Sequence, residues 1–531
     1  MGRRSNGQIL LDLVPGDQFV GNRTLIRQLH KVRAWPEEKY WRVRQELIDQ
    51  GLLIVGKGKG GSVRRLEERP LRERLESDSE QDLSHGDEGS SGGAGGTEEL
   101  NAQESASAHP VLKFIRFEGW KSFRDATLFI DPLTVLIGTN ASGKSNALDG
   151  LQFLNRTALG KELHVALGGD PTLAQLRGGI EWSALQGSTT FRLEVAVKGE
   201  EERTEYQYSI AVDTQPRVQV QHESLKRIRH RPGTSERPYE VYLLNTDPPE
   251  LEHPSITMTL YNGRRGTKKE AHRSASLLSQ LAGQLVGARL PQEVVSGVAA
   301  VSKALRGIFV LDPIPSAMRA FSPFSESLRG DAANIAGVLA ALPKDQRREV
   351  EATLTRYIKE LPERDVRRVW AESVGRFKTD AMLYCEEAWV PGGSTTTVDA
   401  RGMSDGTLRM LGILTALLTR PEGSVLVIEE VDNGLHPSRS ELLVRMLREL
   451  GERRRIDVLV TTHNPALLDA LGPAMVPFVV VAHRDPETGE SRLSLLEEIG
   501  ALPKLMAGGS LGTLSARGQI EQTLEQEARS A

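Results

Sequence analysis

The stretch LTVLIGTNASGKSN, residues 133–146, decides the fold class of this chain. Five strand-forming residues lead into Gly138, and after four intervening residues come Gly143, Lys144 and Ser145. An apolar strand that ends in such a turn and opens a helix predicts a phosphate-binding loop. The loop comprises Gly138, Thr139, Asn140, Ala141, Ser142, Gly143, Lys144, Ser145 and Asn146.

The chemistry of this loop predicts ATP and Mg²⁺ as cofactors. Backbone N–H groups of the turn and the dipole of the following helix attract phosphate groups. Lys144 would supply a positive charge to the β- and γ-phosphates, and the Ser145 hydroxyl would bind Mg²⁺.

Length and composition indicate a globular protein of more than one domain. The chain has 531 residues, of which 39% are hydrophobic and 26% charged, with a net charge of −4. A single cysteine, Cys385, excludes an internal disulfide and a zinc site built on cysteine pairs, and it fits a reducing compartment. We find no continuous apolar run of membrane-spanning length and no signal-peptide pattern. We therefore expect a cytoplasmic protein with no membrane partner.

The sequence divides into three zones. Residues 1–68 hold 13 Lys and Arg against 8 Asp and Glu. Residues 69–108 are rich in Gly, Ser and acidic side chains and predict a flexible linker. Residues 109–531 read as one large α/β unit, with an antiparallel lobe at about 180–265 and a helical region at about 270–395.

Two further strand ends carry polar side chains. The run SVLVIEE ends in Glu429 and Glu430, and IDVLVTTH ends in His463. Because ligands bind at the carboxyl ends of parallel strands, these side chains are expected near the phosphate loop. We assign Glu429 to Mg²⁺ through a water molecule, Glu430 to activation of the attacking water, and His463 to the γ-phosphate or the attacking water. Lys144, Glu430 and His463 are thus the candidate catalytic residues.

The segment RGMSDGT, residues 401–407, precedes the long apolar run LRMLGILTALL. Taken alone, it predicts a helix start at which Ser404 or Asp405 accepts free backbone N–H groups. Its small residues also leave those N–H groups accessible to an anion.

Four motifs, GTNASGKSN, MSDGTLRML, IEEVDNGLHP and TTHNPALLD, resemble those of the ABC-type ATPase superfamily. Within it the chain is most similar to the RecF- and OLD-like predicted AAA ATPases, several of which belong to bacterial antiviral systems. The resemblance covers residues 111–518. It implies an ABC-type P-loop ATPase head of class α/β, with a mixed sheet, an antiparallel β lobe and a helical insertion.

The resemblance also implies site residues and a quaternary structure. In this superfamily two subunits pair head-to-tail, so Ser404 and Gly406 would bind the γ-phosphate held by another subunit. Gln175 is the candidate for the glutamine that contacts Mg²⁺. The chain departs from the family at Val431-Asp432-Asn433, where Pro-Glu-Asn is usual.

Two related activities are not expected. The chain has neither the long heptad insertion nor the Cys-pair tip of coiled-coil repair ATPases. The residues after His463 contain no DxD pattern such as the Toprim nuclease domain of OLD-type proteins carries. We therefore expect an ATPase that is not itself a nuclease and that acts on a separate effector such as a nuclease or toxin.

The N-terminal zone resembles a winged helix-turn-helix domain. Tyr40, Val43, Leu47 and Ile48 form one apolar helix face, and a glycine-rich hairpin follows. Such a domain binds DNA or RNA chiefly through phosphate contacts. A protein-interaction module is the alternative. The candidate nucleic-acid contacts are Lys39, Arg42, Lys57, Lys59 and Arg64.

These predictions lead to one main hypothesis, an ATP-hydrolysing switch that controls an effector in antiphage defence. A RecF-like DNA-binding repair or regulatory clamp, in which hydrolysis times release, is one alternative. A scaffold that binds ATP with little turnover is the other.

Overall fold

The computed structural model describes most of residues 111–530 and scattered positions up to residue 65. Residues 202, 231–237, 250–252, 285–289, 362–365 and 389–392 lie outside the described part. The chain divides into two compact units, Met1–Ala108 and His109–Ala531, which are described separately.

The centre of the larger unit is a six-stranded sheet in the order β13-β18-β19-β6-β20-β21. Its strands are β6 (Leu133–Ile137), β13 (Ile308–Leu311), β18 (Val425–Ile428), β19 (Asp457–Thr461), β20 (Val479–Arg484) and β21 (Ser491–Leu495). All neighbouring pairs are parallel except the edge pair β20–β21. Strands β6, β18 and β19 are buried along their whole length, which explains their continuous apolar sequences.

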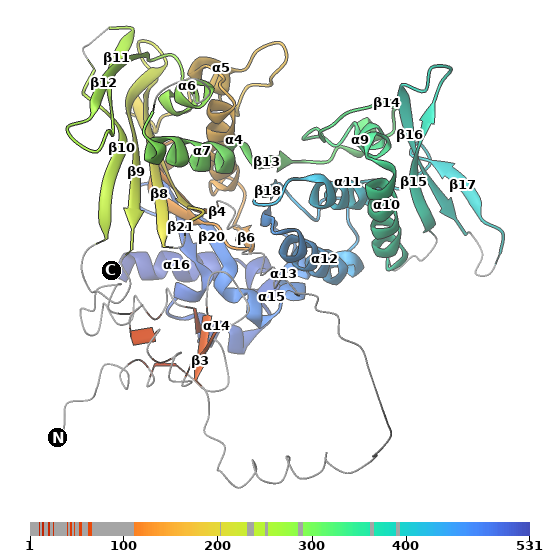
Figure 1. Cartoon of the computed structure of the whole chain (residues 1–531). Coiled ribbons are helices and arrows are strands. Elements are labelled where there is room, and N and C mark those ends of the chain that lie inside the picture. Colours follow the sequence, from red (N-terminus) through yellow and green to blue (C-terminus); the bar gives the residue numbers. More distant parts are fainter. Residues whose placement is uncertain are drawn as a thin grey trace, which may run out of the picture. The chain divides into compact units, whose positions relative to one another are not determined.

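An eight-stranded antiparallel sheet forms the lobe, in the order β12-β11-β10-β9-β8-β7-β4-β5. Its strands are β4 (Val111–Trp120), β5 (Phe123–Phe129), β7 (Thr190–Lys198), β8 (Thr204–Asp213), β9 (Gln219–Arg229), β10 (Tyr239–Thr246), β11 (Ser255–Leu260) and β12 (Thr267–His272). Figure 1 shows α6 (Leu277–Gln284) and α7 (Gln292–Arg306) beside these strands. The lobe thus includes two strands that precede the phosphate loop.

The region expected to be helical, residues 270–395, is mixed. Helices α8 (Pro315–Met318), α9 (Ile335–Ala341) and α10 (Lys344–Lys359) are accompanied by a small antiparallel sheet. Its strands are β14 (Ser322–Pro323), β15 (Val366–Val374), β16 (Asp380–Glu387) and β17 (Thr396–Asp399). Only one face of β15 is buried, through Val369 and Ala371, and a bulge interrupts its register. The bulge and the neighbouring arginines obscure the two-residue period in the sequence.

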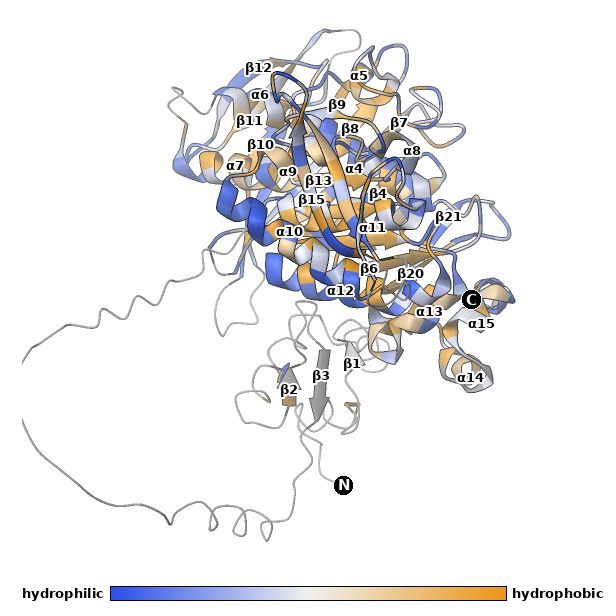
Figure 2. Cartoon of the chain, turned by 90° about the vertical axis from the view of Figure 1, so that its right-hand side faces the viewer, coloured by the Kyte–Doolittle hydropathy of each residue, from blue (hydrophilic) through white to orange (hydrophobic). Residues whose placement is uncertain are grey.

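The remaining elements lie around the central sheet. They are α4 (Lys144–Ala158), α5 (Leu163–Gly168), α11 (Asp405–Thr419), α12 (Ser440–Arg454), α13 (Pro465–Leu471), α14 (Leu502–Gly508), α15 (Leu511–Ala516) and α16 (Gln519–Ser530), with three short 3₁₀ helices, η1 (Pro437–Arg439), η2 (Pro473–Phe478) and η3 (Leu496–Glu498). Figure 2 shows apolar residues on α4 and β4, and hydrophilic residues on the visible faces of α10 and α12.

The central sheet separates two hydrophobic cores. Val135 and Ile137 of β6 belong to one core, and Leu136 between them belongs to the other. Successive side chains of a strand point to opposite faces, so a strand buried on both faces must be apolar at every position. Because β6 packs into both cores, the start of the phosphate loop that follows it is held in place.

In the N-terminal unit the structure describes a three-stranded sheet, β1 (Val20–Gly21), β3 (Ser62–Arg65) and β2 (Leu53–Val55). Tyr40, Val43 and Leu47 are buried, in agreement with an apolar helix face. Arg64 lies in β3, whereas Lys39, Arg42, Lys57 and Lys59 lie outside the described residues. The winged helix therefore stays a prediction. Within the described part of the chain, no helix is long and apolar enough to cross a membrane.

Candidate nucleotide-binding site

The turn between β6 and α4 has a backbone that only glycine accommodates at two positions. Gly138 has a φ of 141°, and a Cβ there would lie 2.1 Å from the Ala482 carbonyl oxygen. Gly143 has a φ of 111°, and a Cβ there would lie 2.5 Å from Ser491 Oγ. Both glycines are therefore required for the loop to fit against β20 and β21.

The loop and the start of α4 are suited to an anion. Gly143 caps α4 without a side-chain hydrogen bond, and the first turn of α4 contains no acidic residue. Ser142 is buried, and its Oγ has no hydrogen-bond partner among the described residues. Thr139 and Asn140 are exposed, so one side of the loop is open to solvent. Free N–H groups at a helix start attract phosphate, and this loop fits a nucleotide phosphate chain.

Lys144 folds back over the loop. Its Nζ donates to the carbonyl oxygens of Gly138 at 2.7 Å and Thr139 at 2.9 Å. Burial lowers the pKa of Lys144, while the charges of Glu430, Glu521 and Glu429 oppose this shift. The ammonium group therefore already lies among carboxylates at the point where the sequence predicts phosphate. Asn146 does not face the same way, because its Nδ2 donates to Ser122 Oγ at 2.7 Å.

The predicted metal ligands Ser145 and Glu429 are in direct contact. Ser145 Oγ donates to Glu429 Oε1 at 2.7 Å, although the two residues are 284 positions apart in the sequence. Burial would raise the pKa of Glu429, but hydrogen bonds from Arg177 and Ser145, with the charges of Arg177 and Lys144, hold it below its usual range. An ionised carboxylate beside a hydroxyl offers the oxygen ligands that Mg²⁺ prefers, so the residues present fit this ion.

Arg177, which no sequence motif indicates, also contacts Glu429. Arg177 Nη1 donates to Glu429 Oε1 at 2.7 Å, and its Nη2 donates to Asp149 Oδ1 at 3.0 Å. Burial would lower the pKa of Arg177, but hydrogen bonds to Asp149 and Glu429 and their charges raise it. Gln175, two residues earlier, is exposed and makes no hydrogen bond with Ser145 or Glu429 within the described region. Its assignment to the metal stays a prediction.

Glu430 adopts a conformation that is unusual for a residue with a side chain. Its φ is 45°, in the left-handed region. The Glu430 N–H donates to Thr461 Oγ1 at 2.8 Å, and its carbonyl oxygen accepts from Arg409 Nη2 at 3.0 Å. Asn433 Nδ2 approaches the carboxylate Oε2 at 3.4 Å, so the altered turn Val431-Asp432-Asn433 still contacts Glu430. Such backbone strain persists only where the surroundings impose it, and it gathers at functional sites.

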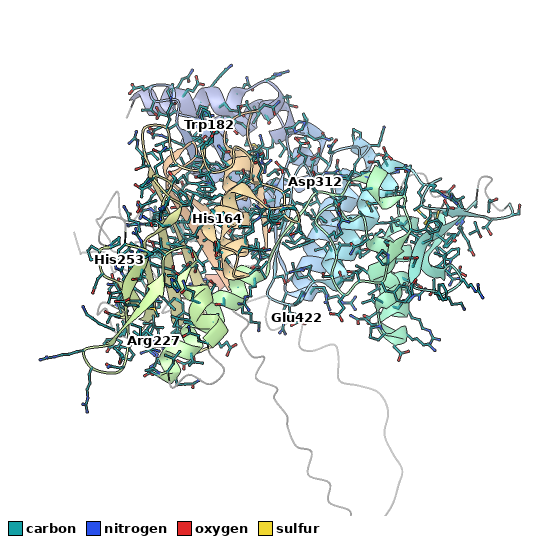
Figure 3. The ribbon with its side chains drawn as sticks, turned by 90° about the horizontal axis from the view of Figure 1, so that it is seen from above. His164, Trp182, Arg227, His253, Asp312 and Glu422 are labelled. Carbon is teal, nitrogen blue, oxygen red and sulfur yellow. The ribbon has the colours of Figure 1, made fainter. Side chains whose placement is uncertain are left out.

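Arg409 connects two parts of the site. It lies on α11, is 5% exposed, and donates to the carbonyl oxygens of Pro313 at 2.9 Å and Glu429 at 3.2 Å. Its Nη2 also pairs with Asp312 at 3.2 Å, the residue labelled near the middle of Figure 3. A buried arginine in the apolar run LRMLGILTALL was the available signal in the sequence, since such a charge requires partners.

His463 and Ser404 are brought to the surface. His463 is exposed in the turn between β19 and α13. Ser404 caps α11, and its Oγ accepts from the Thr407 N–H at 3.1 Å, as the helix-start interpretation predicts. A Cβ at Gly406 would lie 2.6 Å from Arg439 Nη1, so a side chain there would require the Arg439 guanidinium to move. The hydrogen bonds described for Ser404 stay within the start of α11, so its contact with phosphate stays a prediction.

Strands β6, β19 and β18 are neighbours in the parallel sheet. Their carboxyl ends bring Lys144, Thr461 and Glu429 to the same end of the sheet. This arrangement is that of a P-loop nucleotide-binding domain. A family model described as "AAA domain, putative AbiEii toxin, Type IV TA system" matches residues 133–263 and 323–469. Since the match covers a little over half of the chain, the chain belongs to this AAA-domain family.

Individual similar proteins are more distant. The phosphonates import ATP-binding protein PhnC 1 of Ruegeria sp. is 29% identical over 97 residues, which is 18% of this chain and 37% of that protein. Similar solved structures include an SMC head domain from Thermotoga maritima, with a TM-score of 0.35 and 15% identity over 72% of this chain and 98% of that one. An SmcHead bound to the C-winged helix domain of ScpA has a TM-score of 0.40 and 12% identity, over 72% and 97% of the two chains.

Proposed function

We propose that this chain binds and hydrolyses ATP as a switch protein. The observation that carries this proposal is the contact of Ser145 Oγ with Glu429 Oε1 at 2.7 Å, at the same sheet edge as Lys144. The hydroxyl and the ionised carboxylate come from two distant segments and meet beside a helix start that has no side-chain cap. Their contact has a chemical reason if a metal ion and phosphate groups bind there.

The residues of the site have separable roles in this proposal. The loop N–H groups and Lys144 bind the phosphates, and Ser145 and Glu429 hold Mg²⁺, which neutralises charge that develops on the phosphates. Glu430 lies one residue beyond the metal ligand and orients and deprotonates the attacking water. Its backbone contacts with Thr461 and Arg409 support this role, because a general base must be held in position.

Two substitutions test the ATPase proposal. Lys144→Ala is expected to abolish ATP binding, measured by calorimetry. Glu430→Gln is expected to keep binding but to lower steady-state turnover at least about 100-fold, since general base catalysis contributes roughly that much. Unchanged turnover in Glu430→Gln would refute the assignment of the base. If the cellular function survives Glu430→Gln and is lost in Lys144→Ala, the chain acts as a scaffold instead.

We propose further that two copies pair head-to-tail around ATP. Ser404 is exposed, and its described hydrogen bonds lie within the start of α11. It therefore remains available to the γ-phosphate of a nucleotide held by another copy. Gly406 lies in the first turn of α11, and backbone N–H groups at a helix start attract anions.

The biological role proposed is control of a separate effector, such as a nuclease or toxin, in antiphage defence in the cytoplasm. The family description names a putative toxin of a type IV toxin–antitoxin system. Residues 1–68 would sense DNA, RNA or a partner protein. Deletion of residues 1–68 should lower nucleic-acid affinity at physiological salt while ATP binding persists. Unchanged nucleic-acid affinity in the deletion variant would exclude the winged-helix assignment. The alternative function, a repair clamp, predicts DNA affinity and no effector gene beside the gene for this chain.

A further inference from the structure

The Arg177 guanidinium contacts the same oxygen of Glu429 that is expected to face the metal ion. Its Nη1 lies 2.7 Å from Glu429 Oε1, the same oxygen that accepts the Ser145 hydroxyl. Its Nη2 lies 3.4 Å from the carbonyl oxygen of Ser145. The guanidinium therefore contacts both residues that are expected to hold Mg²⁺.

A second carboxylate keeps Arg177 in place. Asp149 on α4 is only 2% exposed, and it accepts from Arg177 Nε at 3.2 Å and Nη2 at 3.0 Å. Lys121 reaches the other oxygen of Asp149 at 2.5 Å and also donates to the Arg177 carbonyl oxygen at 2.7 Å. Both the side chain and the backbone of Arg177 are thus tied to this buried ion pair.

The charges of this group are balanced without a metal ion. Two cations, Lys121 and Arg177, face two carboxylates, Asp149 and Glu429. A divalent ion placed at Glu429 would lie next to the guanidinium, and two like charges at contact distance repel strongly in a partly buried site.

We propose that Arg177 is a positioning residue that holds Glu429 while no metal is bound and releases it when Mg²⁺ binds. This inference rests on the proposed function of the site. The bond from Nη1 to Glu429 breaks, whereas Nε and Nη2 remain on Asp149, so the guanidinium moves without leaving the site. Arg177 is half-exposed, with 50% of its side chain accessible, which leaves room for this movement.

Mg²⁺ then replaces the Arg177 guanidinium on the Glu429 carboxylate, rather than binding a carboxylate that has no partner. Arg177 keeps the carboxylate oriented, and it lowers the affinity for the metal. Removal of the positive charge should consequently tighten metal binding. Removing a positive charge that lies at contact distance from the bound ion removes a repulsion, so the expected effect is a gain in metal affinity of about tenfold.

The experiment measures metal affinity directly, without turnover. Full-length protein is saturated with ADP, and Mn²⁺ is titrated while free Mn²⁺ is followed by electron paramagnetic resonance. Arg177→Gln removes the charge but keeps a donor for Asp149, and Arg177→Lys keeps the charge but cannot span both carboxylates. Arg192→Gln on the exposed face of β7, paired with Glu118, is the matched control for loss of one arginine.

We expect Mn²⁺ to bind Arg177→Gln about tenfold more tightly than wild type, Arg177→Lys with an intermediate affinity, and Arg192→Gln like wild type. Thermal melts should show a larger Mn²⁺-dependent rise of Tm for Arg177→Gln than for wild type. Equal or weaker Mn²⁺ affinity in Arg177→Gln would overturn the inference. If the wild type binds ADP but no Mn²⁺, or binds no ADP, the proposed function fails instead.

Discussion

At the scale of single residues, the phosphate loop depends on the absence of side chains at two positions. Gly138 meets the backbone of β20 so closely that any Cβ would overlap the Ala482 carbonyl oxygen, 2.1 Å away. A backbone atom of a buried strand cannot move aside cheaply, because β20 pairs with β6 on one side and β21 on the other.

Gly138→Ala is therefore expected to destabilise the protein by more than about 3 kcal/mol, from backbone strain and overpacking together. Gly160→Ala is the matched control, since Gly160 also has a positive φ, 86°, but a Cβ there would meet nothing within 4 Å. Its expected cost is about 1 kcal/mol, from strain alone. Denaturant unfolding of both variants measures the difference, and equal costs would show that the close approach is not significant.

At the scale of elements, α11 is fastened to the turn that carries Glu429 and Glu430. Arg409 makes this connection through three carbonyl oxygens and Asp312, although the helix itself is apolar. The same helix is capped by Ser404.

Arg409→Gln is expected to lose about 3 kcal/mol of stability, because buried carbonyl oxygens and a carboxylate lose their donor. It should also lower kcat while the affinity for ATP stays within about twofold, since Arg409 positions the Glu430 turn and not the phosphate loop. Arg445→Gln on α12, where an exposed arginine pairs with Glu360, is the control and should change neither quantity. A change confined to ATP affinity would contradict this role.

The C-terminal helix α16 also reaches the nucleotide site. Ile520 and Leu524 anchor it in the core, and Glu521 lies close enough to Lys144 for each charge to affect the other. Burial raises the pKa of Glu521, the Lys144 charge opposes this shift, and its Oε2 lacks a hydrogen-bond partner among the described residues.

A carboxylate at this position competes with phosphate for Lys144, so Glu521→Gln is expected to bind ATP about threefold more tightly. Calorimetric titration of ATP measures the effect. Glu525→Gln, one helical turn further along α16 and exposed, is the matched control and should leave the affinity unchanged. Weaker binding in Glu521→Gln would mean that the carboxylate supports Lys144 rather than competing with the nucleotide.

At the scale of the whole molecule, one chain holds two separate halves of the proposed site. The phosphate loop, Glu429 and Glu430 share one sheet edge, whereas Ser404 is exposed at the start of α11. Ser404→Arg should therefore preserve ATP binding, because the phosphate loop is unaltered, and abolish ATP-dependent self-association and turnover. Size-exclusion chromatography with ATP, performed in Glu430→Gln to prevent hydrolysis, measures the association. ATP-dependent dimers in the combined variant would exclude the head-to-tail interface.

The sequence by itself was sufficient for the parts of the molecule that local patterns encode. The strand and glycine turn at residues 133–146, the carboxylates after β18 and the helix start at Ser404 all occur where the sequence predicts them. Each depends on neighbours within a few residues: an apolar strand, a glycine that permits a positive φ, or a hydroxyl three residues before the N–H it caps.

Only the tertiary structure decided which distant side chains meet at the site. Arg177, Arg409 and Glu521 come from a loop, a helix interior and the C-terminal helix, and nothing near them in the sequence refers to Glu429, Glu430 or Lys144. The small sheet of β14–β17 depends in the same way on pairing across long separations. Such contacts follow from how helices and sheets pack around two shared cores, and packing is a property of the whole chain rather than of any local pattern.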